Sequence, residues 1–143
     1  MKIKSIKSQI VRLPVDEPLA DGPPSGRAHN MFVTIGIDAT GGVDGVGAAF
    51  FGGALSATLK LAIDQLGEMI VGEDPMRGEA ILQKLRAAGA SAGPGGILTL
   101  AIAGIDMALW DIKGKFFGQP LALMLGGARD RPGERQDGAL RRA

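Results

Sequence analysis

The chain has 143 residues, of which 45% are hydrophobic, and its formal net charge at pH 7 is +1. This length allows one domain with a substantial core. Charges that nearly cancel exclude the basic surfaces typical of proteins that bind nucleic acid or anionic membranes. The sequence contains no cysteine, which excludes disulfides, thiolate metal ligands and cysteine nucleophiles. We therefore expect a cytoplasmic protein whose partners include neither nucleic acid nor a membrane.

Three stretches in the first part of the chain have the composition of β-strands: residues 2–13, 29–38 and 43–50. The first ends at Pro14, and a bulge near Ile10 would let its apolar face change. In the second, apolar residues alternate with others, as expected of a half-buried strand. Residues 15–28 are predicted to form a long loop rich in Pro and Gly, and residues 39–42 a turn. The three strands are therefore predicted to make an antiparallel meander.

Helical periodicity follows over three stretches, at about 54–70, 75–88 and 97–117. Asp74 and Pro75 are typical of an N-cap and of the first helical position. The last helix is nearly apolar on all sides up to Asp106, as expected of a helix enclosed by other structure. Three strands followed by three helices predict the α+β fold class, with the helices packed against one face of the sheet.

An ordered set of motifs runs through the chain. It consists of G-G-V-D-G-V-G at 41–47, A-I-A-G-I-D-M-A-L-W-D-I-K-G-K at 101–115, and the continuation of this helix at 118–127. Together these motifs resemble the N-terminal capping domain of the mandelate racemase and muconate lactonizing enzyme family, within the enolase superfamily. Ala48 departs from the pattern, since many members carry Glu there. The resemblance covers residues 2–128 and implies the α+β fold of that capping domain.

The resemblance also implies that the chain is one part of a two-part enzyme. In that family the second part is a modified (β/α)-barrel that carries three Mg²⁺-binding carboxylates and the acid–base residues. The common step is abstraction of a proton α to a carboxylate. The substrates are small carboxylates such as acid sugars or hydroxy acids, and the outcome is racemisation, loss of water or cycloisomerisation.

A barrel needs about 250 residues, which this chain does not offer. We therefore expect the catalytic barrel to be absent, and with it any catalytic residue or metal ligand. No cofactor is expected in this chain, and Mg²⁺ is expected only in full-length members of the family.

The chain is expected to consist of a capping domain at 1–128 and a polar, disordered tail at 129–143. Eight of the fifteen tail residues are charged and three are apolar, whereas a buried barrel strand is a short run rich in Val and Ile. This change in character predicts a truncated or frameshifted barrel start, or an error in the gene model. A genuine polar extension of a shorter protein is the alternative.

By the same resemblance, two loops would contact substrate. The loop 15–28 corresponds to the mobile lid that closes over the barrel mouth, and 50–53 to a second specificity loop. Such lids exclude water and complete a site. An arginine in the lid could bind a substrate carboxylate with both nitrogens, and the only histidine of the sequence lies at the lid's end. The candidate substrate-binding residues are Arg27, His29, Phe50 and Phe51. Solvated loops without this role are the alternative.

Other conspicuous residues are expected to be structural. Asp106 and Asp111 lie about 140° apart around a helix and do not converge on one ligand. Asp111 would pair with Lys115 one turn on, and Asp106 would make a buried hydrogen bond. Trp110 is expected to be a packing residue. The glycine-rich segment 93–96 precedes a helix, but no Lys-Ser/Thr follows it, so we expect a connector rather than a phosphate loop.

Two functions remain open at this level. The first is the substrate-selecting domain of a Mg²⁺-dependent acid-sugar dehydratase or racemase, inactive by itself. The second is a stand-alone binding or assembly module that pairs with itself or with a barrel-bearing paralogue. Both predict an exposed apolar surface where a barrel would pack, and hence self-association into homo-oligomers.

Overall fold

The strands of the protein form one three-stranded antiparallel sheet, in a computed structural model that describes residues 1–14, 29–50 and 54–127. The strands are β1 (Ile3–Pro14), β2 (His29–Ala39) and β3 (Asp44–Phe50), in the spatial order β1-β2-β3. The helical elements are α1 (Ser56–Glu68), the 3₁₀ turn η1 (Pro75–Arg77), α2 (Gly78–Ala88), the 3₁₀ turn η2 (Ala90–Ala92), α3 (Gly96–Phe117) and α4 (Leu121–Met124). The predicted α+β fold class is confirmed, and the described residues contain no barrel.

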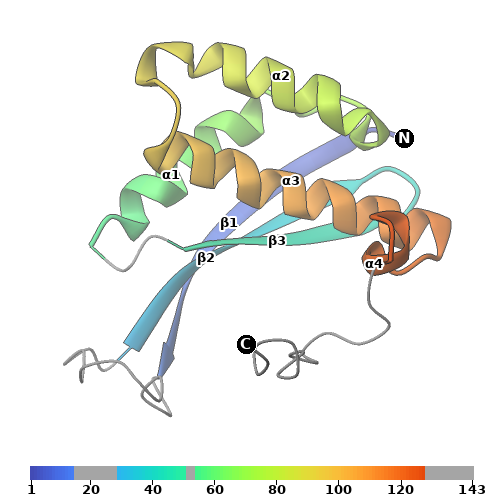
Figure 1. The fold of residues 1–143 in the computed structure, drawn as a ribbon, viewed down its shortest axis with the longest axis horizontal. Helices are drawn as coiled ribbons and strands as arrows, with labels where there is room; N and C mark the ends of the chain where they lie inside the picture. The colour runs from blue at the N-terminus through green and yellow to red at the C-terminus, as the bar shows by residue number, and fades with distance from the viewer. Residues whose placement is uncertain (15–28, 51–53, 128–143) are drawn as a thin grey trace, which may run out of the picture.

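The sheet has one covered face and one open face. Val33, Ile35 and Ile37 of β2 are buried, while their neighbours along the strand are half-buried or exposed, because successive side chains of a strand point to opposite faces. Helices α1 and α3 cover the face that carries these residues, and α2 packs on α3 (Figure 1). The helices therefore lie on one side of the sheet, as predicted.

The predicted bulge near Ile10 is wrong. The ladder between β1 and β2 is continuous around Ile10, and its register shifts only between Ile3 and Ser5. The apolar face of β1 changes at this shift instead, so that Ile3 and Ile6 both face the helices, and the next residue on that face is polar. This residue, Ser8, is buried on the covered face, and its hydroxyl donates a hydrogen bond to the carboxylate of Asp64 in α1.

Glycines bring the backbones of β3 and α3 close together. A Cβ atom on Gly47 would overlap the carbonyl oxygen of Gly104, and one on Gly45 would overlap the carbonyl oxygen of Ala108. Neither β3 nor α3 has room for a further side chain at this contact. The contact therefore explains the glycines at positions 45 and 47 of the motif. The contact fixes α3 over the edge strand of the sheet.

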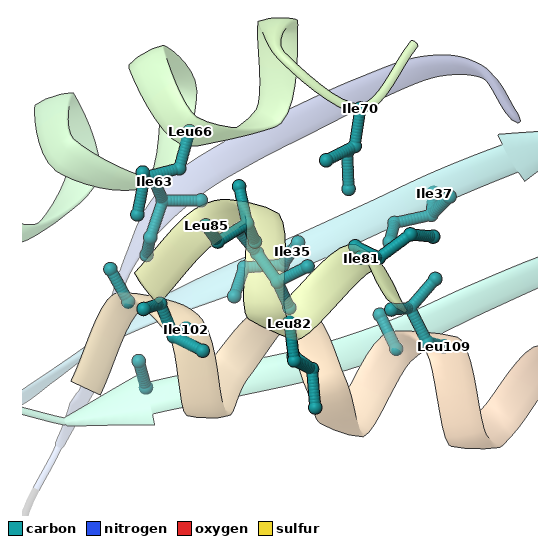
Figure 2. Close-up of a cluster of buried hydrophobic side chains, with 14 of the residues drawn as sticks. Ile35, Ile37, Ile63, Leu66, Ile70, Ile81, Leu82, Leu85, Ile102 and Leu109 are labelled. Carbon is teal, nitrogen blue, oxygen red and sulfur yellow. The ribbon is translucent and has the colours of Figure 1, made fainter. Parts of the chain in front are cut away.

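The core draws its side chains from the sheet and from all three long helices. Figure 2 shows Ile35 and Ile37 of β2 grouped with Ile63 of α1, Leu85 of α2 and Leu109 of α3. Each of these side chains is at most 1% exposed. Full burial of an aliphatic side chain of this size contributes about 1.5–3 kcal/mol, so this cluster is the main support of the fold.

The predicted N-cap before α2 is confirmed, although the helix starts later than expected. The carboxylate of Asp74 accepts a hydrogen bond from the N–H of Met76 at 3.0 Å. Pro75 opens a single 3₁₀ turn, and the α-helix itself begins at Gly78. The chain therefore enters α2 through a tighter first turn, a common device at helix starts.

The end of α3 folds the chain back on itself. Gly118 has a left-handed backbone with φ of 62°, and the N–H of Gln119 donates to the carbonyl of Gly114 at 2.9 Å. This pattern is a Schellman cap, and it lets Leu121 of α4 pack against Gly114. The polar tail predicted at 129–143 lies outside the described residues, so its character and the domain boundary before it stay predictions.

Candidate functional site

One end of the sheet gathers the boundaries of both predicted specificity loops. Pro14, the last residue of β1, pairs with His29, the first of β2, so residues 15–28 leave and re-enter the sheet at adjacent positions. Phe50, the last residue of β3, pairs with Phe32 of β2. We call this the lid end of the sheet, defined by the Pro14–His29 and Phe32–Phe50 pairs.

His29 and Phe50 share the lid end but not a face. Alternation along β2 puts His29 on the same side as the buried Val33, whereas Phe50 lies opposite Phe32 on the open face. Both side chains are exposed. The structure therefore does not bring these two candidate residues together around one point.

The ring of Phe50 has a cross-strand partner that sequence reasoning missed. The ring centroids of Phe32 and Phe50 are 5.1 Å apart, with their planes tilted by 36°. The sequence could have predicted this pair, because Phe32 and Phe50 each lie nine positions from Gly41 in the turn. Residues at equal distances from a hairpin turn pair with each other across the two strands. The remaining candidates, Arg27 and Phe51, lie outside the described residues.

The described part of the lid end offers packing surface and one side chain capable of acid–base chemistry, that of His29. Leu13 and Phe50 are both about half exposed there, at 48% and 47%, and no carboxylate accompanies them on the paired positions. Within residues 1–14, 29–50 and 54–127, no three His, Asp or Glu side chains are grouped so that they could hold a metal ion. Nor do the described helices include one long and apolar enough to cross a membrane.

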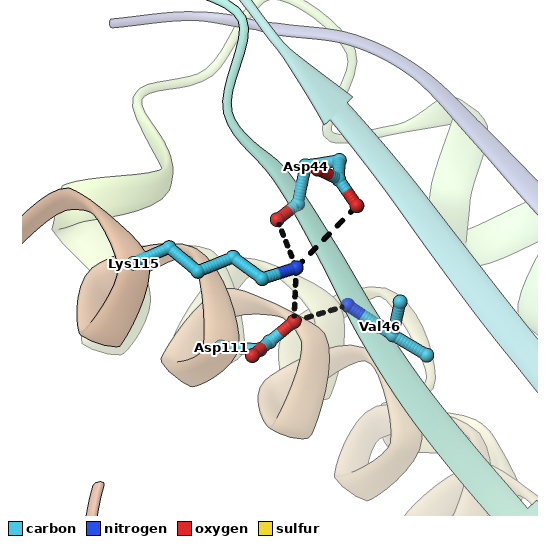
Figure 3. Close-up of polar contacts among 4 residues, drawn as sticks. All are labelled: Asp44, Val46, Asp111 and Lys115. Carbon is cyan, nitrogen blue, oxygen red and sulfur yellow. Dashed lines mark hydrogen bonds and ion pairs between the residues drawn. The ribbon is translucent and has the colours of Figure 1, made fainter. Parts of the chain in front are cut away.

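A polar cluster fastens α3 to the free edge of β3 (Figure 3). The Asp111 carboxylate accepts hydrogen bonds from the N–H of Val46 at 2.8 Å and from the Lys115 ammonium at 2.9 Å. Lys115 also donates to the carbonyl oxygen of Asp44 at 3.0 Å. Because β3 is an edge strand, these bonds satisfy backbone groups that face no neighbouring strand. The predicted pairing of Asp111 with Lys115 is confirmed.

The charges of this cluster are stabilised by its own contacts. Partial burial raises the pKa of Asp111, but hydrogen bonds from Lys115 and from the N–H of Val46 outweigh it and hold the pKa below its ordinary value. The hydrogen bond to Asp111 in turn raises the pKa of Lys115. Both groups stay charged around neutral pH, which suits a structural clamp and not a proton-transfer site.

Asp106 has the opposite environment. It is half-buried between α2 and α3, and its carboxylate makes no hydrogen bond with the residues that the structure describes, so the predicted buried hydrogen bond is not found among them. Burial raises the pKa of Asp106, and the positive charges of Lys113 and Arg86 only partly oppose this. The nearby Lys113 ammonium lies 4.4 Å from the ring centre of Trp110. Asp106 therefore lines a pocket and has no hydrogen-bond donor within residues 1–14, 29–50 and 54–127.

Comparison with known proteins decides the family. Residues 14–126 match the model of the mandelate racemase / muconate lactonizing enzyme, N-terminal domain. The chain belongs to the mandelate racemase / muconate lactonizing enzyme family. The match covers most of the described residues, and the family and domain inferred from the motifs are confirmed.

Members of this family with known activities are much longer than the chain. The L-talarate/galactarate dehydratase of Salmonella typhimurium LT2 is 34% identical, over 90% of this chain and 34% of its own length. The D-galactonate dehydratase of Ralstonia nicotianae is 45% identical, over 71% of this chain and 26% of its own length. The chain thus spans about a third or less of the length of these relatives.

Solved structures of the family agree with the fold. The Salmonella typhimurium LT2 dehydratase, liganded with Mg and L-lyxarohydroxamate, matches with a TM-score of 0.77 and 32% identity, over 90% of this chain and 34% of its own. The mandelate racemase/muconate lactonizing enzyme from Polaromonas sp. JS666 matches with a TM-score of 0.79 and 31% identity, over the same shares of both chains. The three-stranded sheet with its helices is therefore the N-terminal domain of this family.

Proposed function

We propose that this chain is the substrate-selecting domain of a Mg²⁺-dependent acid-sugar dehydratase or racemase and that it supplies no catalytic group itself. The observation that carries the proposal is the lid end of the sheet. There the pairing of Pro14 with His29 and of Phe50 with Phe32 places both ends of one loop and the start of the other at the same end of the sheet. Loops anchored in this way can close over a substrate that is bound by another part of the enzyme.

The substrate class follows from the relatives. The relatives named above act on talarate, galactarate or galactonate, so we assign a small polyhydroxy carboxylate to the full-length form of this protein. Within that site Arg27 is proposed to bind the carboxylate of the substrate, because a guanidinium matches a carboxylate with two parallel hydrogen bonds. His29, Phe50 and Phe51 are proposed to shape the entrance.

Magnesium is assigned to the remainder of the full-length enzyme. The described residues do not fit a Mg²⁺ site, since none of their carboxylates gather in a group of three with other possible ligands, and Mg²⁺ prefers several oxygen ligands in near-octahedral geometry. We therefore assign no metal-dependent step to the described residues of this chain. Its own contribution is binding, orientation and exclusion of water.

A chimera tests the proposal. Residues 1–127 of this chain would replace the matching segment of the Salmonella L-talarate/galactarate dehydratase, and dehydration of several acid sugars would be measured with Mg²⁺. We expect activity to be retained and the ratios of kcat/KM among the substrates to change. Unchanged ratios, or a folded chimera without dehydration, would contradict the proposal.

Two arginines provide a matched comparison within the chimera. Arg27→Gln is expected to raise the KM for acid sugars about tenfold, the loss of one charged hydrogen-bond pair. Arg77→Gln should leave KM unchanged, because Arg77 lies in η1, and the segment just before η1 pairs with the start of β1, opposite to the lid end. Equal effects of the two substitutions would remove Arg27 from the proposed site.

The second candidate function is a stand-alone assembly module, and one observation supports it together with the first function. Large apolar side chains are exposed at the end of α3 and in and just after α4. They are Phe116, Phe117, Leu123 and Leu125, which are 55–65% exposed. Contiguous apolar surface of this kind marks an interaction site. In the first function this surface packs on a barrel, and in the second it pairs with another copy or with a barrel-bearing paralogue.

Light scattering tests the exposed apolar end of α3 and α4. The purified chain is expected to self-associate, and Leu123→Gln with Leu125→Gln is expected to reduce this association and the binding of a hydrophobic dye. Leu61→Gln on α1 is the control, since Leu61 is equally exposed at 57% but lies apart from that surface. A monomeric chain that binds no dye would rule out the surface as an assembly site.

A further inference from the structure

A pocket of about 440 Å³ lies on the side of α3 that faces α2. The second half of α2, the connector that contains η2 and the first half of α3 form its walls. Its volume is within the range of about 300–1,000 Å³ typical of sites for small molecules. None of its lining residues belongs to the lid end of the sheet.

The base of the pocket is apolar and firmly held. Leu82 of α2 and Ile102 of α3 are 5% and 7% exposed and belong to the main core. Leu98 completes this base, and its side chain occupies the space that a side chain at Gly89 would need. The pocket is therefore a fixed hollow with room for an aliphatic group, since its floor is part of the packed interior.

Two opposite charges line the same pocket without pairing with each other. The Asp106 carboxylate has no hydrogen-bond donor among the described residues, and Arg86 forms an ion pair with Glu79 at 3.4 Å. Both members of that pair are well exposed, at 57% and 71%, so their contact is weak and easily exchanged. The pocket is therefore lined by a carboxylate that has no hydrogen-bond donor among the described residues and by a guanidinium whose ion pair is weak.

We propose that this pocket binds a small aliphatic amino acid, with its ammonium at Asp106, its carboxylate at Arg86 and its hydrocarbon part on Leu82, Leu98 and Ile102. A zwitterion suits the pocket because each of its charges meets an opposite one and the complex stays neutral overall. A simple cation would be repelled by Arg86, and a simple anion by Asp106, because both residues line the same pocket. This site is independent of the proposed selection of acid sugars.

Binding can be measured on the chain as it is. Trp110, the single tryptophan of the sequence, lies one helical turn after Asp106, so its fluorescence reports on the pocket. The probes are L-leucine and 6-aminohexanoate at about 10 mM, because ligands of so few atoms reach millimolar Kd values. We expect saturable binding of at least one probe. 4-Methylpentanoate, which lacks the ammonium, and 3-methylbutylamine, which lacks the carboxylate, are expected to bind at least about tenfold more weakly.

Three substitutions locate the site. Asp106→Asn and Arg86→Gln are each expected to weaken binding about tenfold or more, and Ala103→Phe is expected to abolish it by filling the pocket from an exposed position. Glu79→Gln is the control and should preserve binding, since it only frees Arg86. Thermal unfolding of each variant verifies that it is folded.

Three results would overturn the proposal. They are no binding of either zwitterion, equal binding of the single-charge analogues, and binding that survives Ala103→Phe in a folded chain. If amide resonances of the pocket residues instead shift with protein concentration, the surface belongs to a second copy of the chain, and the amino-acid site is excluded.

Discussion

Two aspartates of α3 lie five residues apart and differ in protonation because their neighbours differ. Asp111 accepts hydrogen bonds from Lys115 and from a backbone N–H, so its pKa is lowered even though partial burial opposes this. Asp106 is more buried and accepts none within the described part of the chain, so its pKa is raised. One residue therefore stabilises the fold in its charged form, and the other costs stability when charged.

Removing the Asp111 carboxylate should loosen the clamp between α3 and β3. Asp111→Ala leaves the N–H of Val46 without its acceptor, and we expect a loss of about 1–2 kcal/mol in the free energy of unfolding, as for a hydrogen bond to a charged group. Urea denaturation at pH 7 measures this. Asp44→Ala is the control, since the Asp44 side chain is 64% exposed and should matter by less than about 0.5 kcal/mol. Equal losses would show that the clamp does not depend on Asp111.

The raised pKa of Asp106 gives a pH dependence of known sign. The folded state holds the proton of Asp106 more tightly than the unfolded state, so the ionised carboxylate lowers stability above the folded pKa, and this cost disappears as the pH falls through it. Asp106→Asn is therefore expected to be more stable than the wild type at pH 7. The charges of Lys113, Arg86 and Glu79 act on the carboxylate in the wild type only, and their effect is already contained in the raised pKa.

Denaturation of the Asp106→Asn variant and the wild type at several pH values verifies the sign. Their difference in unfolding free energy should shrink as the pH falls through the raised pKa of Asp106 and vanish below the pKa of an unfolded aspartate, about 3.9. A wild type that is more stable than the variant at pH 7 would mean that the carboxylate has a donor in the folded protein. It would then also weaken the case for the amino-acid pocket.

At the scale of elements, the contact between β3 and α3 decides how the domain is assembled. Two backbones approach so closely at Gly47 and Gly104 that a side chain on Gly47 would overlap the helix. Nothing flexible can yield there, because the atom that would be displaced is a carbonyl oxygen of α3. The motif glycine at position 47 of β3 is therefore needed for close packing against α3.

Alanine substitutions in the sheet test this packing. Gly47→Ala is expected to cost about 2–3 kcal/mol through overpacking. Gly36→Ala is the matched control on β2, where the new Cβ would lie 3.9 Å from the carbonyl oxygen of Lys7, an ordinary contact. This variant should be neutral or slightly more stable. Thermal unfolding compares the two, and similar melting temperatures would refute the close approach of β3 and α3.

Periodicity predicted the strands and helices well because each exposes one face to the core and one to solvent. It failed in β1, where the change of face was predicted near Ile10, although the register shifts between Ile3 and Ser5. It also could not foresee that Asp106 makes no hydrogen bond with the residues that the structure describes, since this depends on how α2 packs on α3. Contacts between elements that are distant in sequence were thus the unpredictable part.

The candidate site was predictable in part for the same reason. The resemblance to the family predicted two specificity loops, and the register places Pro14, His29 and Phe50, which border them, at the lid end of the sheet. That His29 and Phe50 lie on opposite faces follows from alternation once the register is known. The sequence motifs name the residues of a family but do not specify these faces, so the ring partner of Phe50 was missed.

At the scale of the whole molecule, the described residues carry two surfaces that are proposed to contact the substrate or another part of the enzyme. The lid end of the sheet holds the ends of two loops, and the exposed side chains at the end of α3 and on α4 form an apolar surface. The chain spans about a third of the length of its relatives. We infer a domain that orients and selects substrates while the proton transfer is carried out elsewhere.

Deuterium exchange tests this division of labour most directly. The purified chain would be incubated with galactarate or galactonate and Mg²⁺ in D₂O, with the Salmonella L-talarate/galactarate dehydratase as the positive control. We predict no deuterium at the carbon α to the carboxylate beyond that in the sample without protein. Exchange that increases with the concentration of the chain and is abolished by a chelator would contradict the account, because it would place the catalytic groups within this chain.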